Sequence, residues 1–374
     1  MELAEIIGLR PVPCAGLLAT VTRRCPLSCA HCSTSSARTG DQVDGETLLR
    51  FMRTLTSSEH PRVVMFTGGE PLLRPGLVAD LADAARSAGT ATSVLTGAFF
   101  ARGGTKLPDP IRRVAAAVDH FSISVDAFHE REVARTDVFT VLRSLLDSGV
   151  AVSLHIVGTG PEDPYLAEVT ADVRKTFGGA VPMLVSEIRA VGRAAAWAAA
   201  VPAQSTGGMQ PCAMAAWPVI AFDGTVTACC NQDVVDNRPV PALHRLGHID
   251  TDDWATIRAR SLSSPLLRMI RAVGPEYLRD TYLDRATMRS LESEGSDYCG
   301  TCQALGGHPA EVEGRLDFAA GPVGALLDRE AERLQTDDGP VGFVRRHGCA
   351  RYADLVALPG RAAESGHRIV RAQP

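Results

Sequence analysis

The sequence predicts an α/β protein built on a partial, TIM-like (β/α)6 barrel, followed by a small cysteine-bearing domain and a helical C-terminal segment. Apolar runs rich in β-branched residues recur about every thirty residues in the first half of the chain, with helical patterns between them. These runs are nearly continuous rather than alternating, which is typical of parallel strands covered on both faces. Six such units, rather than the eight of a closed barrel, indicate an open one.

The strands and helices of this barrel can be placed individually. Strands are expected at residues 17–21, 63–66, 92–95, 121–125, 150–157 and 181–188. Helices are expected at residues 48–55, 77–88 and 137–148. Asp44 is a suitable N-cap for the first helix, and Pro75 and Gly89 flank the second in the usual order. Ligands of such a barrel belong at the C-terminal ends of its strands.

The pattern divides the chain into four parts. The alternation of strands and helices stops after Arg193, and a linker of small and polar residues follows at 202–208. A helix-like run covers residues 254–272, and the tail from Gly360 is expected to be frayed. The predicted parts are an N-terminal segment at 1–16, the barrel at 17–200, the second domain at 209–310 and a helical segment at 311–374.

Composition excludes several classes of protein. The 38 basic and 43 acidic side chains give a formal net charge of −5, so the chain lacks the basic footprint of a nucleic-acid binder. No apolar run reaches the ~18–20 residues that cross a bilayer, and the N-terminus lacks the basic start of a signal peptide. We therefore expect a cytoplasmic protein without a membrane partner. In that compartment ten cysteines indicate metal binding or catalysis before disulfides.

Three cysteines stand close together directly after the first expected strand. Cys25, Cys29 and Cys32 have the spacing C-x3-C-x2-C. Three thiolates on one tight loop can each bind one iron of a 4Fe–4S cube and leave the fourth iron without a protein ligand. An open metal position is where a substrate or cofactor coordinates, whereas an electron-carrying cluster normally uses four cysteines. A zinc site is the alternative, although no fourth ligand with zinc-like spacing lies nearby.

A second motif, Thr67-Gly68-Gly69-Glu70-Pro71, follows the next expected strand. Together the two motifs resemble the radical S-adenosylmethionine (SAM) superfamily, in which a three-cysteine loop follows the first strand and a Gly-Gly-Glu segment follows the second. The bare backbone of glycine permits close approach of a ligand. Alone, the segment would read as an ordinary turn at a strand end. The resemblance implies that the methionine amino group of SAM is bound by Gly68, Gly69, Glu70 and Pro71.

Two less specific motifs also agree with this resemblance. Ser122, Ser124 and Asp126 end the fourth expected strand, where family members direct Ser and Asp side chains toward the carboxylate and ribose of SAM. The alternative is a polar strand end that caps the next helix. Gly192 and Arg193 follow the sixth strand and resemble a Gly-Arg-Ala segment that lies near the adenine in many relatives.

The resemblance implies an enzyme, a radical SAM oxidoreductase, whose cofactors are a 4Fe–4S cluster and SAM. SAM binds the open iron, and one electron from the cluster cleaves it to methionine and a 5′-deoxyadenosyl radical. This radical abstracts hydrogen from a substrate C–H bond, so the protein supplies placement and a dry pocket. Cys25, Cys29 and Cys32 would carry this catalysis. An external electron donor of the flavodoxin or ferredoxin type is the implied partner.

The second domain is similar to the SPASM/twitch extension of that superfamily, which holds auxiliary iron–sulfur clusters. Its first cysteine pair flanks Gly224 with the spacing C-x11-G-x4-C, and its second pair is C-x2-C. The full SPASM pattern has further cysteines, but His308 and Val312 stand at the next positions. Whether His308 binds metal stays open. The resemblance therefore implies the twitch form, with one auxiliary 4Fe–4S cluster held by Cys212, Cys229, Cys299 and Cys302.

The remaining cysteines have no assigned ligand role. Cys230 neighbours Cys229, and adjacent side chains of a strand point to opposite faces, so the spacing from Gly224 favours Cys229 as the ligand. Cys14 and Cys349 are expected to be small buried hydrophobes. A thiol near the active site can also donate hydrogen to a product radical. Zinc held by paired cysteines is the alternative for the auxiliary site.

Three functions remain open. Many relatives with this extension modify ribosomally made peptides by crosslinks, thioethers or epimerisation, whereas others dehydrogenate or epimerise small amino-sugars and cyclitols. The long segment from Cys230 to Cys299 and the residues after Cys302 favour a peptide, which needs an extended groove. Only 24 residues precede Cys25, so we expect a leader-recognition protein to act in trans. A non-catalytic iron–sulfur or zinc electron-transfer protein would need neither the open cysteine loop nor the Gly-Gly-Glu segment.

Overall fold

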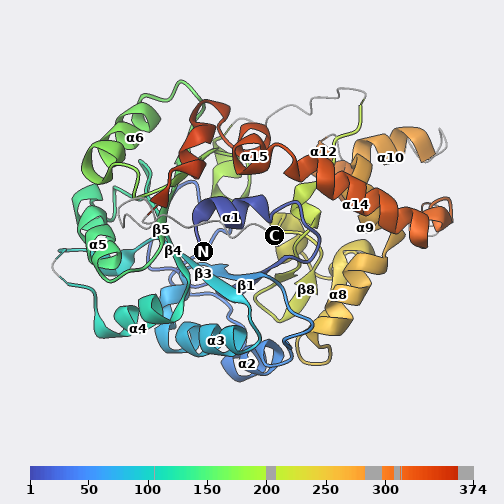
Figure 1. The fold of residues 1–374 in the computed structure, drawn as a ribbon, viewed down its shortest axis with the longest axis horizontal. Coiled ribbons are helices and arrows are strands. Elements are labelled where there is room, and N and C mark those ends of the chain that lie inside the picture. The colour runs from blue at the N-terminus through green and yellow to red at the C-terminus, as the bar shows by residue number, and fades with distance from the viewer. Residues whose placement is uncertain (105, 199–207, 283–296, 307–311, 313, 361–374) are drawn as a thin grey trace, which may run out of the picture.

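The centre of the protein is one sheet of nine strands in the order β6-β5-β4-β3-β2-β1-β7-β8-β9 (Figure 1). The computed structural model describes residues 1–104, 106–198, 208–282, 297–306, 312 and 314–360. The strands are β1 (Gly16–Thr22), β2 (Val63–Gly68), β3 (Ala91–Thr96), β4 (His120–Ser124), β5 (Val152–Gly158), β6 (Met183–Glu187), β7 (Val219–Ile220), β8 (Thr225–Thr227) and β9 (Arg245–His248).

Strands β1 to β6 pair in parallel, each with the next along the chain, and form the partial barrel. The predicted fold class is confirmed, and the expected strand limits differ from the observed ones by at most two residues. Because the strands are parallel, all six C-terminal ends lie at one edge of the sheet. The loops that begin at this edge are therefore brought together in space.

Helices cover the outer face of the barrel between successive strands (Figure 1). Asp44 caps the first of them, since its carboxylate accepts a 2.8 Å hydrogen bond from the Thr47 N–H. The helices are α2 (Gly45–Met52), α3 (Pro75–Ser87), α4 (Asp109–Ala117), α5 (Arg135–Asp147) and α6 (Pro164–Phe177). The three predicted helices correspond to α2, α3 and α5.

The second part of the chain extends the barrel sheet instead of forming a sheet of its own. Strand β7 pairs in parallel with β1, with Leu18 opposite Val219. Strands β8 and β9 then continue in antiparallel fashion. Gly224 adopts a φ of +89° in the turn between β7 and β8, as a tight return of the chain requires.

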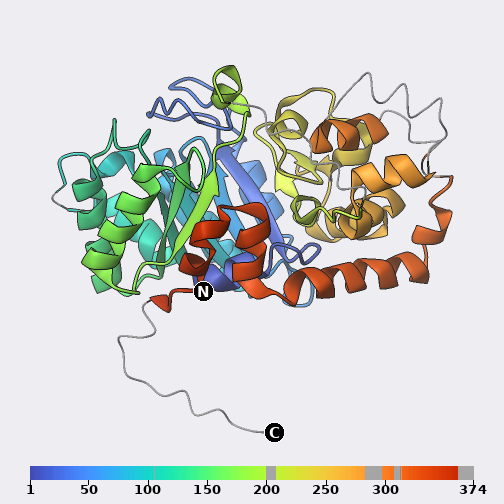
Figure 2. The same cartoon turned by 90° about the horizontal axis from the view of Figure 1, so that it is seen from above.

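The helices of this second part surround the added strands (Figure 2). The run expected at residues 254–272 forms two helices, because Pro265 lacks an N–H and clashes with a preceding helical turn. Ser264 caps the second helix by accepting a hydrogen bond from the Leu267 N–H at 3.3 Å. The helices are α7 (Gln232–Asp236), α8 (Trp254–Ser263), α9 (Pro265–Val273), α10 (Pro275–Tyr282) and α12 (Tyr298–Leu305).

The C-terminal helices return to the barrel and pack on the N-terminal helix. Figure 2 shows α14 (Pro322–Thr336) running from the second part back toward α15 (Gly339–His347) and α1 (Leu3–Gly8). The Cys349 N–H donates to the carbonyl oxygen of Val185 in β6 at 2.9 Å. The apolar cluster between these elements includes Leu3, Ile7, Phe343, Val344 and Val356. Helices α1 and α15 thus close one side of the barrel together.

Two predictions concern segments that are not described. Residues 202–207 of the expected linker and residues 361–374 of the expected tail lie outside the described residues. Within the described ranges, no helix combines the length and the apolar character needed to cross a bilayer.

Candidate radical and auxiliary cluster site

A cavity of about 1260 Å³ begins at the C-terminal edge of the barrel and reaches into the second part of the chain. Nearly all residues that the sequence predicted as metal or cofactor ligands line it, although they come from segments far apart in the chain. Pro71 and Gly192 are the two predicted site residues that do not line the cavity. The fold therefore brings the two groups of cysteines to one cavity.

The three-cysteine loop folds back on itself between β1 and α2. The Cys25 N–H donates to the Ala37 carbonyl at 2.7 Å, and the Cys32 N–H donates to the Cys29 carbonyl at 3.2 Å. Cys29 is buried and the other two thiols are half-buried. Burial, with smaller contributions from Glu70 and the neighbouring thiols, raises the pKa of Cys25 to about 12. Such a thiol stays protonated at neutral pH unless a metal stabilises the thiolate.

The Gly68-Gly69 backbone packs directly against the start of this loop. Gly68 has a φ of +133°, and a Cβ there would lie 2.3 Å from the Thr22 carbonyl oxygen. A Cβ on Gly69 would lie 2.4 Å from the Arg24 carbonyl oxygen. The Gly69 N–H also donates to Thr22 at 2.6 Å, and the Glu70 N–H donates to Arg24 at 2.9 Å. Both glycines are therefore required for the close packing of the loop.

The Glu70 carboxylate connects the loop after β2 to the end of β3. It is fully buried and accepts hydrogen bonds from the Leu72 N–H at 3.0 Å, the Thr96 hydroxyl at 2.9 Å and the Gly97 N–H at 2.9 Å. Burial raises the pKa of Glu70 to about 7, although these hydrogen bonds act in the opposite direction. Both carboxylate oxygens are thus engaged with donors from the protein, and the residue fixes the shape of the cavity wall.

Asp126 forms a buried ion pair beside the cysteine loop. Its carboxylate lies 2.7 Å from Nδ1 of His129 and 3.3 Å from Nε2 of His31. Burial opposes its charge, but these hydrogen bonds hold the pKa of Asp126 well below its usual range. Burial likewise opposes the charge of His129, yet hydrogen bonds to Asp126 and Cys29 raise its pKa to about 10. The pair is therefore ionised at neutral pH.

His31 and His129 are site residues that the sequence motifs did not predict. His31 lies inside the cysteine motif, directly before Cys32, and its buried Nδ1 has no hydrogen-bond partner among the described residues. It lines the cavity, so this nitrogen is available to a bound ligand. The position of His31 within the motif was a usable signal. His129 gave none, because its pairing with Asp126 depends on the turn that follows β4.

The polar residues that end β4 fall into two groups. The Ser122 hydroxyl is 2.8 Å from the Ser153 hydroxyl, which in turn is 2.8 Å from Nε2 of His120. This hydrogen-bonded chain is buried in the barrel wall. Ser124 pairs in register with His155 of β5, and both line the cavity. Burial lowers the pKa of His155 to about 4, so its imidazole is neutral.

Gly192 and Arg193 hold the cysteine loop from the opposite side. Gly192 has a φ of +56°, and a Cβ there would lie 2.4 Å from the Cys32 carbonyl oxygen. The Arg193 N–H donates to that same carbonyl at 3.0 Å. The Arg193 guanidinium donates to the carbonyl oxygens of Cys29 at 2.8 Å and Ser36 at 2.5 Å. The observed role of this segment is therefore to shape the loop that carries the thiols.

The second group of cysteines lies at the other end of the cavity. Cys299 and Cys302 are three residues apart in α12 and so share one face of that helix. Cys212 and Cys229 reach the cavity from the segments beside β7 and β8. Burial raises the pKa of each of these thiols, and the charges of Cys230, Cys302 and Cys212 raise that of Cys229 further. The four sulfurs are thus close enough to interact.

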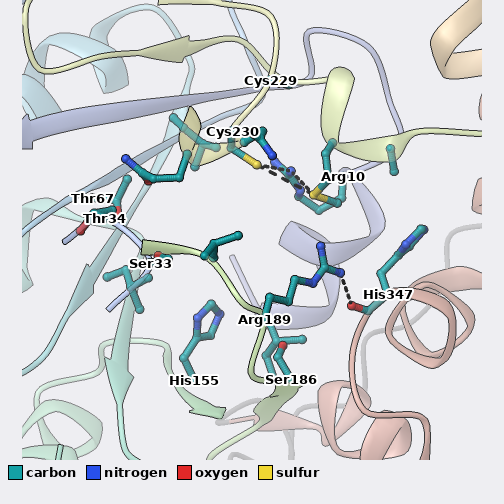
Figure 3. A pocket seen from close by; sticks show the side chains of 18 of the residues that line it. Arg10, Ser33, Thr34, Thr67, His155, Ser186, Arg189, Cys229, Cys230 and His347 are labelled. Carbon is teal, nitrogen blue, oxygen red and sulfur yellow. Dashed lines mark hydrogen bonds between the residues drawn. The ribbon is translucent and has the colours of Figure 1, made fainter. Parts of the chain in front are cut away.

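The other cysteines have different surroundings. The Cys230 thiol points toward Arg10, with Nη2 of Arg10 at 4.0 Å and Sδ of Met214 at 3.9 Å (Figure 3). Cys14 and Cys349 are buried and are not part of the cavity lining. His308 lies outside the described residues.

The donor atoms indicate which metal groups fit. Among the described residues, three possible metal-ligand atoms come within 4.8 Å of one another at His31, Asp126 and His129. Both groups of cysteines offer only thiol donors, which suit iron–sulfur clusters, and four thiols also suit zinc.

A comparison with protein families agrees with this geometry. Residues 19–171 match the family model of the radical SAM superfamily. The matched segment contains the second half of β1, strands β2 to β5, the three-cysteine loop, the Gly-Gly-Glu segment and the residues that end β4. The match to the radical SAM superfamily thus covers the part of the chain that carries both motifs.

Individual relatives cover part of the chain. PqqA peptide cyclase from Gluconobacter oxydans (strain 621H) is 28% identical over 183 residues, which are 46% of this chain and 49% of that protein. GTP 3′,8-cyclase from Heliobacterium modesticaldum (strain ATCC 51547 / Ice1) is 30% identical over 151 residues, which are 38% of this chain and 44% of that protein. The chain thus spans about half the length of these curated relatives.

One solved structure shares the fold more extensively. Streptococcus suis SuiB bound to its precursor peptide SuiA aligns with a TM-score of 0.50 and 11% sequence identity. The alignment covers 79% of this chain and 71% of SuiB. At this identity the similarity shows a common fold.

The packing of Gly192 predicts that its substitution disturbs the cysteine loop. In Gly192→Ala, the added methyl group would collide with the Cys32 carbonyl, so the loop cannot keep its shape. After anaerobic reconstitution, bound iron should fall by about four atoms per chain, the content of one cube. Gly76→Ala is the control, because an added Cβ there has no neighbour within 4 Å. Unchanged iron in Gly192→Ala would contradict the role given to this segment.

The orientation of Cys230 predicts which of two neighbouring cysteines binds metal. In a background of Cys25→Ala, Cys29→Ala and Cys32→Ala, about four irons per chain should remain. Cys229→Ala should remove them, whereas Cys230→Ala should retain them. Iron and zinc are counted by inductively coupled plasma mass spectrometry. Iron lost with Cys230→Ala, or stoichiometric zinc in the background protein, would overturn the assignment.

Proposed function

We propose that the protein is a radical SAM enzyme that cleaves SAM reductively and abstracts hydrogen from a ribosomally made peptide. One observation carries this proposal: the three-cysteine loop, the Gly-Gly-Glu segment and the second group of four cysteines line the same cavity. A simple electron carrier has no need of a cavity of about 1260 Å³ beside its cysteines.

The residues that would hold the cofactors follow from their positions. Cys25, Cys29 and Cys32 would hold the first 4Fe–4S cluster, and Cys212, Cys229, Cys299 and Cys302 would hold the auxiliary one. Together the first cluster and SAM, when bound, supply one-electron cleavage of SAM to methionine and a 5′-deoxyadenosyl radical. The residues proposed to contact SAM are Gly68, Gly69, Glu70, Pro71, Ser122, Ser124, Asp126, Gly192 and Arg193.

The protein fixes the shape of the cysteine loop and places charged side chains beside it. Arg193 and the Gly68-Gly69 backbone fix the backbone of the cysteine loop from two sides. The ionised pair of Asp126 and His129 places fixed charges beside Cys29. Apolar side chains such as Leu95 line the same cavity and limit the water that a reactive radical would meet.

The auxiliary group is suited to electron transfer. Four protein thiols complete the coordination of one 4Fe–4S cluster, so no iron is left for a substrate. A cluster held by these four cysteines would supply one-electron redox chemistry for the conversion of a substrate radical to product. An external donor of the flavodoxin or ferredoxin type would supply the electron to the site of Cys25, Cys29 and Cys32.

The relatives favour a peptide substrate. PqqA peptide cyclase acts on a peptide by its name, and SuiB was solved with a precursor peptide bound. The product would be a crosslink, a thioether or an epimerised residue.

A small-molecule substrate is the second candidate. GTP 3′,8-cyclase shares 30% identity with part of this chain and acts, by its name, on a nucleotide. The same site could therefore serve a small amino-sugar or cyclitol. The transfer of hydrogen from each type of compound distinguishes the two candidates.

The deciding experiment follows deuterium from substrate to 5′-deoxyadenosine. Reduced, reconstituted protein is incubated with SAM and a precursor peptide from the same gene cluster, deuterated at its Cα and Cβ positions. Mass spectrometry should detect deuterium in 5′-deoxyadenosine, because the radical takes hydrogen directly from the peptide. Cys29→Ala is the control and should form no 5′-deoxyadenosine.

Two results would count against the proposal. Label that arrives from a deuterated amino-sugar, and from no neighbouring peptide, would establish the small-molecule alternative. Formation of 5′-deoxyadenosine at the wild-type rate by Cys29→Ala would contradict radical SAM chemistry at this loop.

A further inference from the structure

Three arginines border the cavity on the side that is closed by the two ends of the chain. Arg10 follows α1, Arg189 follows β6, and Arg346 lies near the end of α15. All three line the cavity, and we call them the arginine cluster. Figure 3 shows Arg10 and Arg189 reaching into this space near His347.

Arg10 is the most deeply buried member of the arginine cluster. Its residue is 9% exposed, and its guanidinium lies 4.3 Å from the ring centroid of Trp217. Its Nη2 contacts Sδ of Met214 at 3.3 Å and Sγ of Cys230 at 4.0 Å. Sulfur atoms are weak acceptors, and no carboxylate among the described residues forms an ion pair with Arg10. The positive charge of the buried Arg10 guanidinium is therefore only partly balanced by its neighbours.

The other members add positive charge at the same place. The Arg189 guanidinium donates to the His347 carbonyl oxygen at 3.4 Å and has no acidic partner within the described ranges. Burial lowers the pKa of His347 to about 4, and the positive charges of Arg346, Arg189 and Arg10 contribute to the decrease. All three guanidinium groups therefore act on one imidazole, which is neutral at physiological pH.

Acidic side chains of the cavity wall do not balance this charge. Glu70 is occupied by donors from its own loops, and Asp126 is paired with His129. Glu187 also lines the cavity, but it is exposed, interacts with the Cys349 thiol and forms no ion pair with a member of the arginine cluster among the described residues. Arg346 has an ion pair with Asp338 at 3.2 Å, but Arg10 and Arg189 have no comparable contact among the residues described. This part of the cavity is thus positive and suited to an anionic group.

We propose that the arginine cluster binds a carboxylate of the substrate, either an acidic side chain or the C-terminal carboxylate of a peptide. This inference rests on the proposed peptide-modifying function and adds a specificity determinant to it. The planar guanidinium presents paired donors that match the two oxygens of a carboxylate. A carboxylate held there would be anchored on the closed side of the cavity, while the rest of the peptide extends toward the cysteine loop.

Binding of short peptides tests this site without radical chemistry. The full-length, reconstituted protein is saturated with SAM, kept without reductant and studied by saturation-transfer NMR. The probes are acetyl-Ala-Glu-Ala-amide, acetyl-Ala-Gln-Ala with a free C-terminus, and the neutral acetyl-Ala-Gln-Ala-amide. At least one acidic probe should bind about tenfold or more tightly than the neutral one, as a charge-assisted contact predicts. The first two probes distinguish a side-chain carboxylate from a terminal one.

Matched variants link this preference to the arginine cluster. Arg10→Met and Arg189→Met should each remove most of the preference, and Arg10→Lys should retain part of it because the charge remains. Arg113→Met is the control, since Arg113 is 61% exposed and pairs with Asp80 on the outer face of the barrel. Arg189 is exposed, so its variant reports on binding even if Arg10→Met proves unstable.

The possible outcomes separate this inference from the proposed function. Equal binding of all three peptides, or an acidic preference that survives in both methionine variants, would overturn the carboxylate site. Binding of GTP without binding of either acidic peptide would do the same and would indicate a phosphate site. Because the assay needs no SAM cleavage, failure of the radical chemistry would leave its result unaffected.

Discussion

The site depends on close backbone contact between the cysteine loop and two glycine-containing segments. Gly68-Gly69 packs against the start of the loop, and Gly192-Arg193 packs against its end. A side chain at Gly68, Gly69 or Gly192 would overlap a carbonyl oxygen of the loop. The loop has little secondary structure of its own, so these contacts, with the Arg193 guanidinium, determine where its thiols lie.

The extended sheet explains how two cysteine groups come to share one cavity. Strand β7 adds to β1 on the edge opposite β6, so the second part of the chain begins beside the cysteine loop. Helices α1 and α15 then close the side of the barrel, and their ends carry Arg10 and Arg346. The cavity therefore has thiols at both ends of its length and positive charge along its closed side. Each feature comes from a different part of the chain.

The sequence predicted the barrel well because its strands have local, repeating signals. Apolar runs and helix caps such as Asp44 are readable from neighbouring residues. The contacts of Arg193 with Cys29 and of His129 with Asp126 were not predictable, because they depend on loops that meet only after the barrel forms. The pairing of β7 with β1 was also not predictable, because a strand of two residues gives almost no periodic signal. Pro265 divides the helix expected at residues 254–272 into α8 and α9, because a proline cannot continue the helix that precedes it.

The central claim is that the cluster held by the three-cysteine loop binds SAM directly. Electron–nuclear double resonance of the reduced protein, mixed with SAM that carries ¹⁵N in its methionine amino group, tests this claim most directly. The account predicts a ¹⁵N coupling to the reduced cluster in the wild-type protein and its loss in Cys25→Ala. A wild-type cluster whose spectrum shows no ¹⁵N coupling while SAM is bound would contradict the account.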